Sequence, residues 1–191
     1  MRYPIVLDLE TKHSFREFSD PKKLGISVLG IYDYQDNKLK AFFETELNAV
    51  FPVLEHASLI IGFNINSFDL PVLQGYYPGH TDQFKTFDIL DDIKEKLGRR
   101  LALNDIASAT LNKKKSGHGL QAIDFYNEGQ FERLKNYCLD DVSLTKDLFE
   151  HGVKEKKIYY PHTNGKLEMS VNWGEYLTQK DDADVSLTLP F

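Results

Sequence analysis

The chain has 191 residues, of which 41% are hydrophobic and 27% charged, and its net charge is −6. This composition excludes the disordered and fibrous classes, and the length suits one compact domain. The apolar runs are too short to span a membrane and the first residues lack a signal-peptide pattern, so we expect a cytoplasmic protein without a membrane partner. A single cysteine, Cys138, excludes an intrachain disulfide and a cysteine-based zinc site.

Apolar runs in the first half of the chain predict a mixed β-sheet. The predicted strands lie at 3–10, 25–34, 38–44, 58–63 and 84–87. The first is apolar on both faces, as expected for a central strand that is covered on two sides. The second and third flank Gln35-Asp36-Asn37, a hairpin signal, so the sheet is expected to start as an antiparallel meander.

Helical periodicity alternates with these strands and continues after them. The predicted helices lie at 46–57, around Pro71, and at 89–97, 103–111, 119–128 and 131–150. The pattern predicts an α/β fold, with a mixed five-stranded sheet and helices on both faces. We expect residues 1–152 to form this domain. Residues 153–191 would form a C-terminal extension with a hairpin and an acidic, apolar tail.

Asp8 and Glu10 come at the end of the first predicted strand. Side chains two residues apart on a strand share a face, so both carboxylates point into one space. Two anions at the end of a buried strand repel each other unless cations neutralise them, which favours a divalent-metal site. The alternative is that both carboxylates end the strand and face solvent.

The helix predicted at 131–150 places a third carboxylate on a buried face. Leu134, Cys138, Thr145, Leu148 and Phe149 follow the spacing of one apolar stripe. Asp141 falls on this stripe seven residues after Leu134, and Tyr137 lies one turn before it. A carboxylate in an apolar stripe needs a partner, and a metal shared with Asp8 and Glu10 would supply one. A buried Asp141 bonded to the backbone or to Lys146 is the alternative.

The segment 62–71 reads as a strand end, a polar turn and a helix start, where α/β sheets commonly carry functional groups. Asp69 lies in this turn. It is a candidate for the same site, although Asp69 or Ser67 could also cap the helix that follows.

Together these acids resemble the three motifs of the DEDD 3′-5′ exonuclease superfamily, which has the ribonuclease H-like fold. The motifs here are Asp8-Leu9-Glu10-Thr11, Asn64-x-x-x-Phe68-Asp69 and Tyr137-x-x-x-Asp141. The chain is similar to the tyrosine subtype, because Tyr137 stands four residues before Asp141. The histidine subtype would carry a histidine five residues before this acid, where the chain has Asn136.

The stretch from Thr86 to Gly152 is similar to one branch of this group. That branch is the YprB-type ribonuclease H-like proteins, which are related to the exonuclease domain of family B DNA polymerases. The segments that carry the resemblance are Phe87-Asp88-Ile89-Leu90, Leu97-Gly98-Arg99-Arg100, 115–122 and 137–142. The resemblance as a whole covers about residues 3–152.

This resemblance implies a metal-dependent 3′-5′ exonuclease that acts on single-stranded DNA or RNA ends with two ions of Mg²⁺ or Mn²⁺. Asp8, Glu10 and Asp141 would hold one ion. Asp8 would bridge to the second ion, which Asp69 would support, and Tyr137 would orient the attacking water. The two cations would offset most of the net negative charge, which otherwise disfavours a polyanionic substrate.

Further residues become candidates for binding the strand. Those for holding the terminal nucleotide by hydrogen bonds and stacking are Thr11, Asn64 and Phe68. Those for phosphate contact, beside a glycine-rich turn, are Lys113, Lys114 and Lys115. The last five residues, 187–191, resemble peptides that dock on bacterial sliding clamps, which makes a clamp or another replication or repair protein a candidate partner. A disordered end or an edge strand is the alternative.

Two other functions are open at this point. One is a catalytically silent ribonuclease H-like module that binds nucleic acid or protein, against which the presence of all four acids and Tyr137 argues. The other is a small-molecule phosphatase with Asp8 as nucleophile. That chemistry usually has a second aspartate two residues later, where this chain has Glu10.

Overall fold

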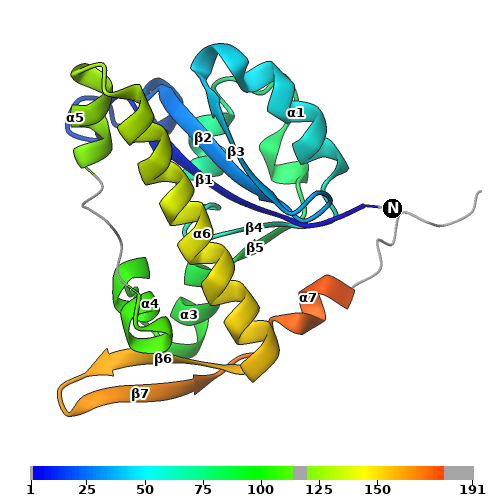
Figure 1. Cartoon of the computed structure of the whole chain (residues 1–191), viewed down its shortest axis with the longest axis vertical. Coiled ribbons are helices and arrows are strands. Elements are labelled where there is room, and N and C mark those ends of the chain that lie inside the picture. Colours follow the sequence, from blue (N-terminus) through cyan, green and yellow to red (C-terminus); the bar gives the residue numbers. More distant parts are fainter. Residues whose placement is uncertain (1, 114–119, 179–191) are drawn as a thin grey trace, which may run out of the picture.

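In the computed structural model, which describes residues 2–113 and 120–178, helices cover both faces of a five-stranded sheet (Figure 1). Its strands are β1 (Ile5–Thr11), β2 (Ile26–Asp33), β3 (Lys38–Phe43), β4 (Ile60–Gly62) and β5 (Thr86–Asp88). All five predicted strands are present, so the predicted α/β fold class is confirmed.

The sheet is mixed, with strand order β3-β2-β1-β4-β5, which places β1 at its centre. β1 is antiparallel to β2 and β2 to β3, as the predicted meander requires. β1 is parallel to β4, but the two strands pair only at Ile5 and Val6. The later residues of β1 therefore need other partners on that side for their backbone groups.

Side chains of β1 alternate between two hydrophobic cores. Ile5, Leu7 and Leu9 belong to the core on one face of the sheet, and Val6 belongs to the core on the other. Asp8 and Glu10 follow Val6 at spacings of two, so they share its face. Both carboxylates thus stand on the face of the sheet where the long helix α6 (Phe131–Glu155) packs.

The helices that cover the sheet are α1 (Leu47–His56), α2 (Asp69–Leu73), α3 (Ile89–Leu97), α4 (Leu103–Leu111), α5 (Gln121–Asn127) and α6 (Phe131–Glu155). α6 crosses β1 and β2 on one face, and α1 packs on the other (Figure 1). The predicted stripe of α6 is confirmed, since Leu134, Cys138, Thr145, Leu148 and Phe149 are all buried. The helix runs five residues beyond the predicted end. Its C-cap residue, Lys156, has a left-handed backbone conformation, which ends the helix.

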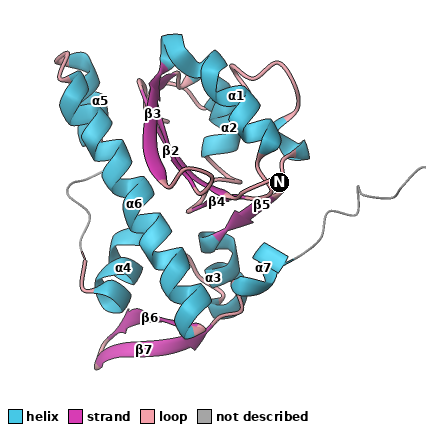
Figure 2. Cartoon of the chain, turned by 45° about the vertical axis from the view of Figure 1, so that its right-hand side comes forward, coloured by secondary structure: helices cyan, strands magenta, loops and turns pink. Residues whose placement is uncertain are grey.

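The chain continues after α6 into β6 (Lys157–His162), β7 (Gly165–Ser170) and α7 (Gly174–Thr178). β6 and β7 form the predicted hairpin, which lies apart from the main sheet (Figure 2).

Trp173, between β7 and α7, is fully buried. Its ring lies parallel to that of Phe149, with 6.1 Å between the ring centroids, and its Nε1 donates a hydrogen bond to Asp92. A Cβ on Gly152 would lie 2.1 Å from the Trp173 ring. The predicted docking peptide at 187–191 lies outside the described residues.

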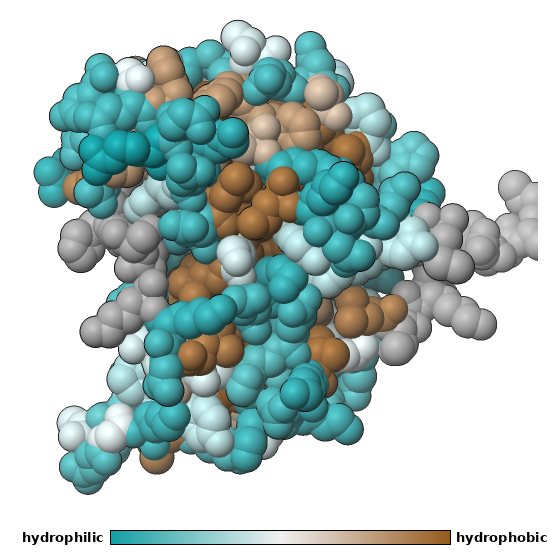
Figure 3. All heavy atoms as spheres, in the orientation of Figure 1, coloured by the Kyte–Doolittle hydropathy of each residue, from teal (hydrophilic) through white to brown (hydrophobic). Residues whose placement is uncertain are grey.

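Hydrophilic side chains cover most of the face seen in Figure 3, with hydrophobic ones gathered near its middle. Among residues 2–113 and 120–178, no helix has both the length and the apolar character that crossing a membrane requires.

Candidate metal centre and cleft

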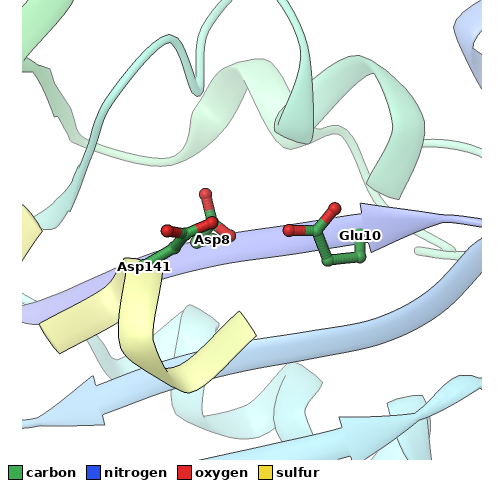
Figure 4. A group of neighbouring side chains, drawn as sticks. All are labelled: Asp8, Glu10 and Asp141. Atoms are coloured by element: carbon green, nitrogen blue, oxygen red, sulfur yellow. The ribbon is translucent and has the colours of Figure 1, made fainter. Parts of the chain in front are cut away.

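Three carboxylates from two elements meet beside the second half of β1 (Figure 4). Asp8 and Glu10 project from the same face of β1, and Asp141 reaches them from α6. One oxygen atom of each residue lies within 4.8 Å of those of the other two. Asp141 is only 1% exposed, whereas Asp8 and Glu10 are partly buried. The structure thus brings together three of the four predicted acidic ligands.

Asp141 can reach β1 because α6 packs very closely on the sheet at Gly30. Gly30 pairs with Asp8 across the β1–β2 ladder. A Cβ atom at Gly30 would lie 2.8 Å from Cys138 Sγ and 2.9 Å from Val142 Cγ2. These distances are shorter than van der Waals contact, so any side chain here would push α6 away from the strands.

The Cys138 thiol lies in a strongly negative electrostatic environment. Burial raises the pKa of this thiol well above its ordinary value, and the charges of four carboxylates raise it further. In order of decreasing effect, these belong to Asp8, Glu10, Asp141 and Asp69. The thiol stays protonated and lies 3.6 Å from the carbonyl oxygen of Asp8, to which it donates. All four predicted acids therefore act on one buried point beneath the site.

Asp69 is fixed to β1 by a buried hydrogen bond. Its Oδ1 accepts from the backbone N–H of Leu9 at 2.9 Å, in the part of β1 that β4 does not pair. The carboxylate is 3% exposed and stands beside the residue that separates Asp8 from Glu10. α2 begins at Asp69, and its N-cap residue, Phe68, makes no side-chain capping bond. Asp69 thus ties the polar turn to the strand that carries the other acids.

Asp88 both caps a helix and holds the turn that follows β4. Its Oδ1 accepts from Leu90 N at 2.9 Å, which caps α3, and from Asn64 N at 2.8 Å. Its Oδ2 accepts from Asn66 N at 3.0 Å. Burial raises the pKa of the Asp88 carboxyl above its usual value, even though these backbone bonds favour the charged form. Asp88 is thus both a helix cap and the anchor of the turn that holds Asn64.

An open cleft of about 550 Å³ lies beside the carboxylates. It is lined by Asp8, Glu10 and Asp69 and by the three predicted nucleotide-binding residues, Thr11, Asn64 and Phe68. Thr11 is buried and its hydroxyl donates to the carbonyl of His13 at 2.8 Å. The convergence of these motif residues on one cleft follows from the fold, because β1 and β4 are parallel, so the second half of β1 and the turn that follows β4 lie at the same edge of the sheet.

Two residues of the cleft, Phe15 and Arg16, were absent from our sequence prediction. They lie in the irregular segment between β1 and β2, where no periodicity marks a functional position. Phe15 is 53% exposed, and its ring meets the Phe68 ring edge-on at 5.8 Å. The signal in the sequence that could have identified Phe15 is its position, an aromatic residue shortly after the motif at Asp8–Thr11.

Not all of the predicted site residues line the cleft: Tyr137 and Asp141 do not. Tyr137 is buried on α6, one turn before Asp141, with its ring edge-on to Phe125. Lys113 does not line the cleft, and its Nζ pairs with Asp147 on α6. Lys114 and Lys115 lie outside the described residues. Phosphate contact by this run of lysines therefore stays a prediction.

The donor set of the site fits a hard divalent cation. Within the described part of the chain, Asp8, Glu10 and Asp141 form a group of oxygen donors close enough to share one ion. Carboxylate oxygens are the ligands that Mg²⁺ and Mn²⁺ prefer, whereas zinc sites usually include histidine or cysteine. The sulfur atom of Cys138 does not belong to this group of donor atoms.

Comparison with known proteins agrees with this architecture. The model of the RNase H superfamily matches residues 5–153. Among solved structures, the fold is similar to the family B DNA polymerase from the hyperthermophilic archaeon Pyrobaculum calidifontis, with a TM-score of 0.59 and 18% sequence identity. This similarity covers 78% of the chain and 24% of the polymerase, so the chain spans about a quarter of that protein. No curated protein matches the chain. The chain belongs to the RNase H superfamily.

Proposed function

We propose that this protein is a metal-dependent 3′-5′ exonuclease of the tyrosine-type DEDD class, acting on single-stranded DNA or RNA ends. The observation that carries this proposal is the convergence of Asp8, Glu10 and Asp141 beside an open cleft. Membership of the RNase H superfamily supports a nuclease. The aromatic and amide side chains of the cleft suit a nucleotide, which offers a base to stack on and polar atoms to bond.

In this proposal the four acids would hold two divalent cations. Asp8, Glu10 and Asp141 would hold the first, and Asp8 and Asp69 would hold the second. Such ions, when bound, neutralise charge on the phosphate and lower the pKa of the attacking water. The protein contributes the fixed positions of the carboxylates, which the Gly30 contact with α6 and the Asp69–Leu9 hydrogen bond maintain.

Other residues of the site orient the reactants. Tyr137, one turn before Asp141, orients the attacking water in this proposal. Thr11 and Asn64 bond the terminal nucleotide, and the Phe68 ring supplies an apolar face against which a base can stack. A cleft that is open to solvent admits a free strand end without unfolding of the protein.

The test is digestion of a single-stranded oligonucleotide that carries its label at the 5′ end. With Mg²⁺ or Mn²⁺, we expect a ladder of products that shorten from the 3′ end, and no products in EDTA. Asp141→Asn should lower the rate at least ~100-fold, because a ligand to the reacting centre is lost. Asp140→Asn, a change at the adjacent exposed carboxylate of α6, is the matched control and should retain activity.

Other outcomes would redirect the assignment. Cleavage of a circular strand at the same rate would indicate an endonuclease. Release of phosphate from a simple monoester would indicate the phosphatase. Absence of Mn²⁺ binding in isothermal titration calorimetry, with no cleavage, would indicate a silent binding module.

A further inference from the structure

The side chain of Asn64 is held in place by an arginine that does not itself line the cleft. Arg100 Nη2 donates to Asn64 Oδ1 at 2.6 Å, across 36 residues of sequence. Arg100 follows Gly98, whose left-handed conformation ends α3 and reverses the chain. Arg99, its exposed neighbour, makes no hydrogen bond or ion pair with any described residue. The two adjacent arginines thus differ in a single respect that can be tested.

This contact determines what Asn64 can offer to a ligand. The arginine side chain only donates hydrogen bonds, so the atom that it contacts must be the carbonyl oxygen of the amide. The Nδ2 group of Asn64 makes no hydrogen bond within residues 2–113 and 120–178. It carries two N–H donors and no acceptor. A ligand atom bound by Asn64 must therefore be an acceptor, which excludes the proton of a hydroxyl group.

The backbone of Asn64 is restrained as firmly as its side chain. Asn64 has a φ of 70°, in the left-handed region, and its N–H donates to the buried carboxylate of Asp88 at 2.8 Å. Asn66, two residues later, donates to the same carboxylate. With one hydrogen bond to the backbone and another to the side chain, the amide has little freedom left to lose when a ligand binds.

An anionic phosphate oxygen is the acceptor that best satisfies such a donor. Hydrogen bonds to charged acceptors are roughly twice as strong as neutral ones. The carboxylates of Asp8, Glu10 and Asp69 line the same cleft and repel a phosphate, so a donor is most useful on the wall that Asn64 occupies.

We propose that Arg100 is a positioning residue for strand binding. Its hydrogen bond to Asn64 Oδ1 fixes the amide so that the Nδ2 group can donate to a phosphate oxygen of the bound strand. This inference rests on the proposed function, because it takes a nucleic-acid strand as the ligand, but it concerns binding rather than cleavage.

The test is a double-mutant cycle on the affinity for a short fluorescent oligothymidylate, measured by anisotropy with Ca²⁺ present. Asn64→Gly removes the side chain and tolerates the positive φ, and it should weaken binding ~10-fold to ~100-fold. Arg100→Ala should weaken binding, and the double variant should bind no more weakly than Asn64→Gly alone. Arg99→Ala, the matched control, should stay within about twofold of wild type.

Two further readouts separate positioning from a general effect. Asn64→Asp keeps the Arg100 partner but replaces the amino group by an anionic oxygen, so it should bind at least as weakly as Asn64→Gly. The Arg100→Ala defect should persist at high salt, because it acts through a neutral amide, whereas a direct charge effect is screened. Melting temperatures of all variants within a few degrees of wild type would confirm that folding is intact.

Opposite results would overturn the inference in recognisable ways. Additive losses in the double variant would mean that Arg100 acts independently of Asn64. Tighter binding by Asn64→Asp than by Asn64→Gly would reverse the assigned polarity. A wild type that binds the strand but never cleaves it with Mg²⁺ would refute the exonuclease and leave the affinity cycle decisive for the positioning role of Arg100. A wild type that does not bind the strand refutes both.

Discussion

Asp141 combines almost complete burial with two neighbouring carboxylates, and at the residue scale this makes it costly for the metal-free protein. We predict that Asp141→Asn raises the melting temperature in EDTA by ~2–4 °C, because a buried negative charge is removed from a repulsive group at a gain of ~1 kcal/mol. Wild type should gain stability on addition of Mn²⁺, and the variant should lose most of this gain. Differential scanning calorimetry with EDTA and with Mn²⁺ measures both effects.

Asp140→Asn is the control for this prediction, since Asp140 is exposed on the same helix. It should leave the response to Mn²⁺ intact. An Asp141→Asn variant that is less stable than wild type in EDTA would show that the carboxylates are not in mutual repulsion.

Glu44 leads to a prediction about how the stability of the protein depends on pH. Burial would raise the pKa of its carboxyl, but hydrogen bonds from Lys12 and Tyr76 outweigh burial and lower that pKa below its usual value. A lowered folded-state pKa stabilises the protein above the unfolded-state value of ~4.3 and stops doing so as the pH falls through the folded-state value. Wild type should therefore melt above Glu44→Gln at pH 7, and this difference should shrink below about pH 4.3.

Thermal melts of both proteins from pH 7 to pH 3 provide the measurement. Glu95→Gln, at an exposed position of α3, should show no such convergence with wild type. A difference between wild type and Glu44→Gln that stays constant with pH would mean that the Glu44 charge does not contribute.

At the element scale, the position of α6 depends on Gly30. We predict that Gly30→Ala costs ~1–3 kcal/mol of unfolding free energy, because the new methyl group overlaps Cys138 and Val142. It should also lower nuclease activity more than the loss of folded protein explains, because the displaced helix carries Asp141. Urea denaturation and steady-state kinetics on the same samples separate the two effects.

The double variant Gly30→Ala/Cys138→Ala is the control for this packing argument. It removes the sulfur atom nearest to the new methyl group, so part of both the stability and the activity should return. A double variant that is no better than Gly30→Ala would place the strain elsewhere.

Trp173 is one of the residues that join the C-terminal elements to the main domain, together with the hydrogen bonds between Thr110 and Tyr159. We predict that Trp173→Ala destabilises the protein by ~3–5 kcal/mol, as expected for the loss of a fully buried aromatic side chain. The ring packs on Phe149 of α6 and Phe87 of β5, so the loss should appear in the unfolding of the whole domain. Urea denaturation measures it, and Leu177→Ala, at a 45% exposed position of α7, should cost far less. A separate unfolding transition for the C-terminal elements would contradict this coupling.

At the scale of the whole molecule, the net charge of −6 limits how the protein can bind a strand. Among the described residues that line the cleft, Arg16 is the one lysine or arginine. With about one phosphate neutralised, the logarithm of the affinity should fall with the logarithm of salt at a slope of about −1. Anisotropy titrations at several salt concentrations measure this slope. A steep slope near −6 would mean that an extended basic track exists.

Much of this protein could be predicted from its sequence, because the relevant patterns are local. The alternation of β1 placed Asp8 and Glu10 on one face, and the apolar stripe of α6 placed Asp141 on the buried face of its helix. Both patterns repeat within a few residues and follow from backbone geometry alone. The five strands, the antiparallel meander at the start of the sheet and the C-terminal hairpin could be predicted for the same reason.

The tertiary structure decided what depends on contacts between distant segments. Gly30 lies 111 positions before Asp141, yet it sets how closely α6 approaches β1. Three hydrogen bonds likewise join residues that are far apart in the chain. They run from Leu9 N–H to Asp69, from Asn64 N–H to Asp88 and from Arg100 to Asn64 Oδ1. Periodicity in the sequence predicts which face of an element is buried. The point at which two elements cross depends on the volume and shape of the side chains between them, and these side chains meet only in the folded chain.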